Sequence, residues 1–440
     1  MWLEGFAFGC KSVFLSVNEG AAKLEFRASC AGRLKVAAHV GFASLAHGGK
    51  IVYTHTMPSI NDIMSVAEAL EKSPVVVVRD NCVAVRNRNA ACRRCVDACP
   101  ADAIDVCGNE LTLHTSLCNS CGACTVACPT EALVSVAPTS TSMLQSATAA
   151  LEVAGNRAVF ACARIASKHL ADPASFTEVP CLSRVDETTM LSLAVLGAER
   201  VLLVDGDCST CKYRDCAVHA DVAVAFAREL LDAQGCAVPV ERTTGFPDDL
   251  KIQDTGGMFG TTRRGFFSEA VGAAKETAMT AARTTMAQEL GLDVGEVGLG
   301  ERLRVTESGT LPLIRSPRHE AAINALDALG QSQVEFIDSR LFGSVTIDTQ
   351  RCNSCNMCSV FCPTGALKRD EADSLGAPLR YLEFSACECV QCGLCVDVCW
   401  KGALTLSSQV NTDQLFDFEP VTFHLSSANA RKNSVFGKNW

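Results

Sequence analysis

Cysteines at short, repeated spacings are the residues of this chain best suited to chemistry. The 440-residue chain has 26 cysteines, of which nine lie at 82–128, five at 162–216 and nine at 352–399. Both outer groups contain the spacing C-x2-C-x2-C-x3-C. Three thiolates on such a tight loop can bind three irons of one cubane, and the fourth cysteine reaches a neighbouring cluster. The outer groups therefore predict pairs of 4Fe–4S clusters that exchange their last ligands.

The C-terminal group holds two complete motifs. The first is CNSCNMCSVFCP at 352–363, and the second is CVQCGLCVDVCW at 389–400. Trp400 stands where a proline is usual, which alters the turn after the motif and leaves the ligands unchanged. The exchange rule predicts one cluster bound by Cys352, Cys355, Cys358 and Cys399, and a second bound by Cys389, Cys392, Cys395 and Cys362.

The N-terminal group holds one complete motif and one that lacks its first cysteine. CNSCGACTVACP at 118–129 is complete, whereas NAACRRCVDACP at 89–100 has Asn89 in the first ligand position. The exchange rule predicts one cluster bound by Cys118, Cys121, Cys124 and Cys99. The other has Cys92, Cys95 and Cys128, and needs a fourth ligand.

We expect Cys82 to supply this fourth ligand. Nine residues separate Cys82 from Cys92, and an extended residue spans about 3.3–3.6 Å, so the loop easily crosses a cubane. Three alternatives are a ligand oxygen from Asn89, a three-cysteine 3Fe-type centre, and Cys107. Oxygen suits iron–sulfide chemistry poorly, and Cys107 lies on the far side of Cys99 in the sequence. The set Cys82, Cys92, Cys95 and Cys128 brings the expected total to four cubanes.

Zinc is the main alternative for any single C-x2-C pair. Zinc sites take four ligands, commonly in two pairs, and do not need a third cysteine two residues further on. The two outer groups are also repeats of each other, because residues 118–133 and 352–367 match at 11 of 16 positions. Both groups resemble bacterial ferredoxins that carry two 4Fe–4S clusters, over about 82–136 and 345–406. The resemblance implies a βαββαβ fold and one-electron transfer.

The segment between the two cysteine-rich groups has a different pattern. Apolar runs at 158–160 and 201–205 predict buried strands, and 217–234 predicts a helix that ends before Gly235. This alternation predicts a small parallel α/β domain. Further expectations are a strand at Val75–Val78 and helices at 59–72, 266–290 and 319–329.

The central segment resembles the iron–sulfur delta subunit of viologen-reducing hydrogenase and heterodisulfide reductase systems. Cys181, Arg184 and Asp186 fit one element of that family, and Cys211 and Tyr213 fit another. Cys162 keeps the first half of an early C-x2-C pair, whose second position holds Ile165. We expect an additional metal, iron–sulfur or redox site on the loop 208–216 with Cys181 as partner. The alternative is that Cys162, Cys181, Cys208, Cys211 and Cys216 are buried small apolar side chains.

Composition restricts the partners. A net charge of −10 and 6% aromatic residues argue against nucleic-acid binding. The N-terminus lacks a signal-peptide pattern, and apolar runs such as 190–198 are half the length of a membrane span. These features predict a cytoplasmic protein without a membrane span. The basic run Arg86, Arg88, Arg93 and Arg94 predicts a solvated face, and as an alternative a group that raises a cluster potential or docks an acidic partner.

The combined prediction is α+β ferredoxin-like domains at both ends of the cysteine region, flanking a small α/β parallel-sheet domain. The expected function is single-electron transfer as a subunit of, or shuttle for, a larger oxidoreductase, with redox proteins as donor and acceptor. The alternative is an accessory or maturation protein, or a redox sensor, for a metalloenzyme. No catalytic acid, base or nucleophile stands out, so the sequence leaves open whether the chain is an enzyme. The expected segments are 1–79 of unknown role, 80–136 ferredoxin-like, 157–240 α/β, 241–340 linking with helices, 341–410 ferredoxin-like and 411–440 a tail.

Overall fold

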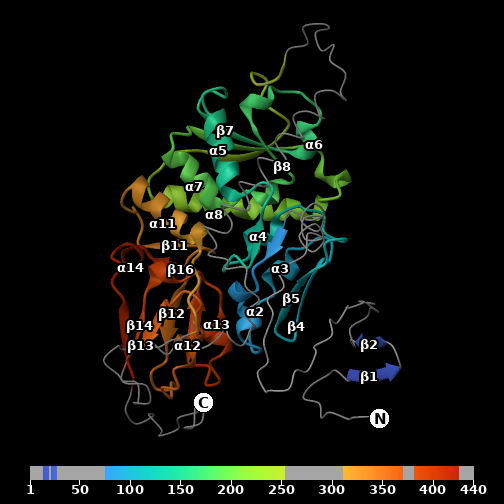
Figure 1. The fold of residues 1–440 in the computed structure, drawn as a ribbon. Coiled ribbons are helices and arrows are strands. Elements are labelled where there is room, and N and C mark those ends of the chain that lie inside the picture. The colour runs from blue at the N-terminus through green and yellow to red at the C-terminus, as the bar shows by residue number, and fades with distance from the viewer. Residues whose placement is uncertain (1–12, 19–20, 27–74, 253–310, 370–380, 426–440) are drawn as a thin grey trace, which may run out of the picture. The chain divides into compact units, whose positions relative to one another are not determined.

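The computed structural model describes residues 13–18, 21–26, 75–252, 311–369 and 381–425. Contacts divide the chain into two units, 1–59 and 60–440. In the first unit, β1 (Val13–Asn18) and β2 (Ala21–Phe26) form an antiparallel hairpin. The helices expected at 59–72 and 266–290 lie outside the described residues. Everything below concerns the second unit (Figure 1).

The N-terminal cysteine-rich segment has the expected order of strands and helices. Two antiparallel pairs, β3 with β6 and β4 with β5, frame the short helices that carry the cysteines. The elements are β3 (Val75–Val77), α2 (Val83–Arg86), α3 (Arg94–Asp97), β4 (Ile104–Cys107), β5 (Glu110–Leu113), α4 (Ala123–Ala127) and β6 (Leu133–Ser135).

The C-terminal cysteine-rich segment repeats this arrangement. Strand β12 pairs with β15 and β13 with β14, in the same order as the first segment. The bounds are β12 (Ser344–Ile347), α12 (Met357–Phe361), β13 (Leu367–Arg369), β14 (Tyr381–Phe384), α13 (Leu394–Asp397) and β15 (Leu404–Ser407). Strand pairing continues past both ends of the segment 341–410, and the domain boundaries at 341 and 410 stay a prediction. The added elements are β11 (Phe336–Asp338), β16 (Gln409–Asn411), α14 (Thr412–Phe416) and β17 (Val421–His424).

A four-stranded parallel sheet in the order β10-β9-β7-β8 forms the central segment, which confirms the strand–helix prediction. Its strands are apolar because both faces are covered by helices; Val159 and Phe160, for example, are fully buried. The elements are α5 (Ser140–Ala150), β7 (Arg157–Cys162), α6 (Ala163–Ala166), β8 (Thr177–Val179), α7 (Glu187–Val195), β9 (Arg200–Asp205), α8 (Ala217–Ala233) and β10 (Val240–Thr244).

Helix α11 (Pro317–Leu329) connects the three segments through its first turn. Ser316 caps it by accepting a hydrogen bond from the backbone N–H of His319, and the helix packs on α7. Arg318 donates to the carbonyls of Thr125 and Val126 at 2.9 Å each, and to that of Cys128. These carbonyls end helix α4 and have no partner within it.

The same turn reaches the C-terminal segment. The imidazole of His319 is buried between two carbonyls, with Nε2 2.7 Å from Cys387 O and Nδ1 3.2 Å from Leu341 O. A second connection is the ion pair of Arg340 with Glu187 on α7, at 2.6 and 2.7 Å. Glu187 is 1% exposed, so this pair is shielded from water and fixes the two segments against each other.

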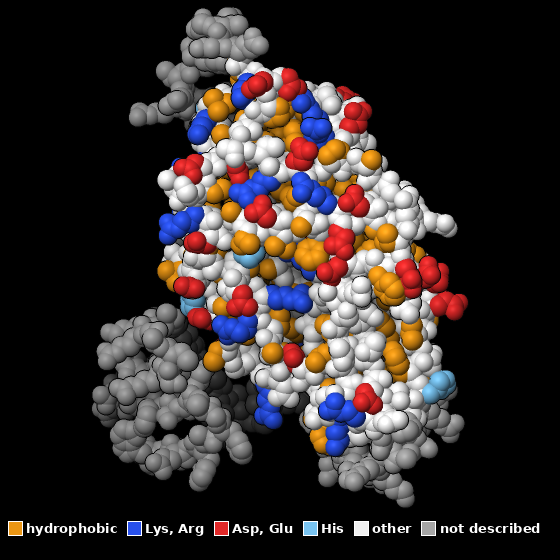
Figure 2. Space-filling model, turned by 180° about the vertical axis from the view of Figure 1, so that it is seen from behind, with side chains coloured by type: hydrophobic (Ala, Val, Ile, Leu, Met, Phe, Trp, Pro, Cys, Tyr) orange, Lys and Arg blue, Asp and Glu red, His pale blue; other side chains and the backbone are white. Residues whose placement is uncertain are grey.

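The described surface is mixed in charge and carries scattered apolar side chains. On the face in Figure 2, acidic and basic side chains are interspersed over the described part. None of the helices in the described ranges has the length and apolar character that a membrane crossing requires.

We expect the substitution Arg318→Ala to destabilise the protein by about 2–3 kcal/mol, because it leaves several half-buried carbonyls without a charged donor. Arg318→Lys should recover only part of this loss, since an ammonium cannot reproduce the geometry of the guanidinium fork. Denaturant unfolding of the anaerobic protein measures both values. Arg315→Ala is the matched control, because Arg315 pairs with Glu320 on the exposed surface. Equal effects of the alanine variants at 318 and 315 would contradict the role given to Arg318.

Candidate metal centres

The first group of thiols, set A, is Cys82, Cys92, Cys95 and Cys128. They line one pocket of about 330 Å³. Burial raises the pKa of Cys82, and the neighbouring Cys128 and Cys92 raise it further. Burial and the same neighbours raise the pKa of Cys95 to about 12. Four thiols in so small a volume can all be ionised only if cations compensate their charge.

The backbone agrees with Cys82, and not Asn89, as the fourth member of set A. Asn89 is exposed, whereas Cys82 is 8% exposed. In each complete motif the residue two positions after the first cysteine has a left-handed backbone: Ser120, Ser354 and Gln391, with φ of 62°, 59° and 54°. Ala91, the corresponding residue here, is not among the described residues with positive φ. The backbone at 89–91 therefore lacks the turn that the complete motifs make before their second cysteine.

The second N-terminal group, set B, is Cys99, Cys118, Cys121 and Cys124. Cys124 is buried at the centre, and burial raises its pKa well above the usual value. Cys121, Cys118 and Cys99 surround it and add to the shift in that order. Cys99 therefore lies beside the cysteines of the second motif, and Cys128 lies beside those of the first, as the exchange of fourth ligands requires.

The C-terminal thiols gather in the same way. Set C is Cys362, Cys389, Cys392 and Cys395, which line a second pocket of about 330 Å³. Burial raises the pKa of Cys389 to about 12. Set D is Cys352, Cys355, Cys358 and Cys399, in which burial and the other three thiols raise the pKa of Cys358. All sixteen predicted ligands thus lie in the four expected groups, while their binding of metal stays a prediction.

Backbone amides support the fourth cysteine of three motifs. The Sγ atoms of Cys99, Cys128 and Cys399 accept the N–H of the residue four positions later, at 3.3, 3.2 and 3.3 Å. Such hydrogen bonds fix the position of each Sγ atom relative to the following strand. Within the described ranges no three cysteine, histidine or acidic side chains lie close enough to hold one metal ion. The sets are therefore spaced more widely than the ligands of a single ion.

A buried arginine lies where sets A and C meet, which corrects the expectation of a solvated basic face at this residue. Arg86 is 5% exposed and donates to Pro312 O at 2.7 Å, and its buried Nε has no partner. Burial lowers the pKa of Arg86, and the nearby Cys362 and Cys392 oppose this shift. An anionic cluster among these thiols would compensate the buried cation, so the surroundings fit such a group.

The two cysteine-rich segments share an apolar contact beside Arg86. Val83 packs with Leu394 and Val398, and Cys92 and Cys392 lie against this cluster. Hydrogen bonds from Arg94 to Gln391 O and from the backbone N–H of Ala91 to Asp397, both 2.8 Å, hold the contact. Sets A and C are thus adjacent.

Comparison with known families agrees with these thiol groups. A 4Fe–4S dicluster domain matches residues 351–409, a 4Fe–4S binding domain matches 111–134, and a further 4Fe–4S binding domain matches 80–102. The chain binds several 4Fe–4S clusters. It is a multi-cluster ferredoxin-like protein. Comparison with curated proteins and with solved structures gives no match.

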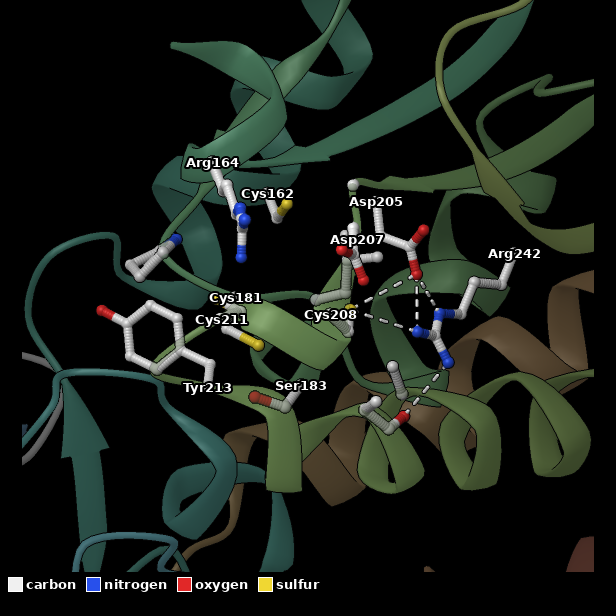
Figure 3. A pocket seen from close by; sticks show the side chains of 15 residues that line it. Cys162, Arg164, Cys181, Ser183, Asp205, Asp207, Cys208, Cys211, Tyr213 and Arg242 are labelled. Atoms are coloured by element: carbon white, nitrogen blue, oxygen red, sulfur yellow. Dashed lines mark hydrogen bonds and ion pairs between the residues drawn. The ribbon is translucent and has the colours of Figure 1, made fainter. Parts of the chain in front are cut away.

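The central cysteines lie in two places. Cys162, Cys181, Cys208 and Cys211 line a pocket of about 420 Å³ at the carboxyl ends of the parallel strands (Figure 3). Arg242 borders this pocket and donates to Asp205 at 2.6 Å and to Cys208 Sγ at 3.5 Å. The three family matches leave this segment uncovered, and its resemblance to the delta subunit stays a prediction.

Cys216 lies apart from this pocket and is fully buried. Its thiol is within hydrogen-bonding reach of Cys121 in set B and of Cys181 at the pocket. The hydrogen bond between Cys216 and Cys181 is the main cause that lowers the pKa of Cys181 to about 6. The sequence singled out Cys216 as one of three cysteines on a loop, but did not predict its contact with set B.

Gly122 allows set B to approach the central segment. Its φ is +81°, and a Cβ there would lie 2.5 Å from Cδ and 3.0 Å from Cβ of Arg184. We expect Gly122→Ala to destabilise the protein by about 1–3 kcal/mol more than Gly393→Ala, because only the first overpacks a buried contact. Gly393 occupies the same motif position with φ of +82° and open space around it. Unfolding midpoints and iron content measure the difference; equal losses would refute the steric argument.

Arg86 should raise the reduction potential of the nearest clusters by its positive charge. We expect Arg86→Gln to make one or two cluster potentials more negative by on the order of tens of millivolts. Potentiometric titration followed by electron paramagnetic resonance measures the shift. Arg88→Gln is the control, since Arg88 is exposed. A shift of the same size in the control would show that general surface charge is responsible.

Proposed function

We propose that this protein carries single electrons through four 4Fe–4S clusters bound by sets A, B, C and D. The observation that supports this most is the gathering of sixteen cysteines into four separate groups of four. Each group joins ligands from two motifs, as the exchange of fourth ligands requires. When bound, the clusters supply reversible one-electron chemistry, and the chain buries them and compensates their charge.

Neighbouring thiols give the order of the four centres. Cys358 of set D interacts electrostatically with Cys395 of set C. Cys92 of set A interacts in the same way with Cys392 of set C. Cys95 of set A acts on Cys124 of set B. The route therefore runs D–C–A–B, with set D at one end and set B against the central segment.

The end of this route at set D is suited to a redox partner. Trp400 follows the ligand Cys399 directly and is 64% exposed, with the ammonium of Lys401 4.0 Å from its ring centroid. We place the contact with a larger oxidoreductase at this exposed aromatic side chain. Such a partner recognises an apolar surface with a basic edge, and acidic residues on it would complement Lys401.

Reductive titration of the anaerobic, fully loaded protein tests the proposed function. We expect about four electrons per chain, one for each cluster, taken up and returned without loss of iron. A protein that assembles clusters for others should instead release iron and sulfide to an apo-ferredoxin on the same timescale. Transfer of clusters that outpaces electron transfer would overturn the carrier function in favour of the maturation role.

Cys82→Ser should remove one cluster, or convert it to a 3Fe form, because set A then has three thiols. Iron content should fall from roughly sixteen to roughly twelve or fifteen per chain, and the low-temperature resonance of one cluster should change. Asn89→Ala and Cys107→Ser are the controls, and both residues are exposed. An unchanged spectrum in Cys82→Ser with a change in either control would assign the ligand elsewhere.

A further inference from the structure

Three neighbouring thiols connect the end of the cluster route to the central pocket. Cys216 lies between Cys121 of set B and Cys181, and its thiol is within hydrogen-bonding reach of both. Cys216 is 0% exposed, whereas Cys181 also lines the pocket. All three are free thiols in the structure. The proposed cluster ligand Cys121, the buried Cys216 and the pocket residue Cys181 therefore follow one another in space.

Hydrogen bonds hold these three thiols in a contact between set B and the central segment. The phenol of Tyr213 donates to Asn119 O at 2.7 Å, and the hydroxyl of Ser183 donates to Cys121 O at 3.3 Å. Both acceptors belong to the first ligand loop of set B. Gly122, the next residue of that loop, lies directly against the side chain of Arg184. The loop is thus held on the two segments that carry Cys181 and Cys216.

The other pocket thiols are engaged differently. The Cys208 thiol donates to Asp205 at 3.7 Å and its Sγ accepts from Arg242 at 3.5 Å. In the described ranges no three candidate ligand side chains stand close enough for a single metal ion. Among the thiols that line the pocket, Cys181 is the one that packs against Cys216 and lies within hydrogen-bonding reach of it. Two adjacent thiols beside an electron donor suit reversible disulfide chemistry better than the binding of a single metal ion.

We propose that Cys181 and Cys216 form a redox-active dithiol–disulfide pair that exchanges two electrons, one at a time, with the 4Fe–4S cluster of set B. Reduction breaks the Sγ–Sγ bond, and two electrons and two protons give two thiols; oxidation returns the two electrons to the cluster and releases the protons. The pair therefore stores two electrons at the end of a one-electron route. This inference rests on the proposed assignment of set B.

Disulfide mapping of the anaerobic, cluster-loaded protein tests the pair. The full chain is equilibrated in glutathione buffers of increasing potential, quenched with acid and alkylated, and its linked peptides are identified by mass spectrometry. We expect a Cys181–Cys216 linkage that appears under oxidising conditions and disappears on reduction. Cys236→Ser is the control, because this central cysteine lies outside the group and its loss should leave the linkage unchanged. Absence of the linkage at every potential overturns the proposal.

Electron counting adds an independent readout. The oxidised protein should take up about two electrons more than Cys216→Ser and Cys181→Ser, since a disulfide is a two-electron couple. Both variants should keep the iron content and the cluster spectra of the unchanged protein. Loss of iron in both would assign these cysteines to a metal and overturn the pair. A Cys121–Cys216 linkage would instead refute Cys121 as a cluster ligand, and low iron in the unchanged protein would refute the four-cluster assignment alone.

Discussion

Gathering sixteen cysteine thiols in four adjacent groups imposes one electrostatic constraint on this protein. Negative charge in a low-dielectric interior is costly unless cations or amide dipoles stand close to it. The structure places arginines at the sites where sets meet other segments. Arg86 is buried between sets A and C, and Arg184 is 3% exposed beside set B. A buried cation is destabilising when no negative charge lies near it: Cys362 and Cys392 lie near Arg86, and Asp186 and Cys124 lie near Arg184.

Helix α11 supplies positive charge to backbone carbonyls near the thiol sets. Helix α4 ends at the ligand Cys128, where its last carbonyls need donors. Arg318 supplies them from a position 190 residues further along the chain. Since His319, the next residue, contacts the C-terminal segment, one helical turn both completes the end of α4 and fixes the spacing of the segments.

Local pattern was sufficient for the features that depend on local spacing. Sets B, C and D follow from the C-x2-C-x2-C-x3-C spacing, and the strands β7 and β9 from apolar runs of strand length; set A also needs Cys82, which the motif does not include and which is inferred from the reach of the loop. Arg86 shows where this reasoning fails. In the sequence it belongs to a basic run expected in solvent, but its partner Pro312 is 226 residues away. A contact between residues so far apart cannot be predicted from the local sequence pattern. The contact of Cys216 with Cys121 could not be predicted for the same reason. Helix α5, which begins at Ser140, is not among the elements predicted from the sequence; Thr139 caps it by accepting a hydrogen bond from the N–H of Ser142.

Shared cores constrain how electrons can move along the proposed order D–C–A–B. One apolar core runs from central residues such as Phe160 to C-terminal residues such as Phe342, and a smaller one joins Val83 to Leu394. Rates of electron transfer fall steeply with distance, so packed contacts between neighbouring sets make large motions of the segments unnecessary. Reorganisation is also reduced where a buried arginine is already in place, as Arg86 is near set C and Arg184 is near set B. The route therefore depends on the fixed packing of the second unit, and substitutions that loosen its junctions should slow transfer between sets before they remove any cluster.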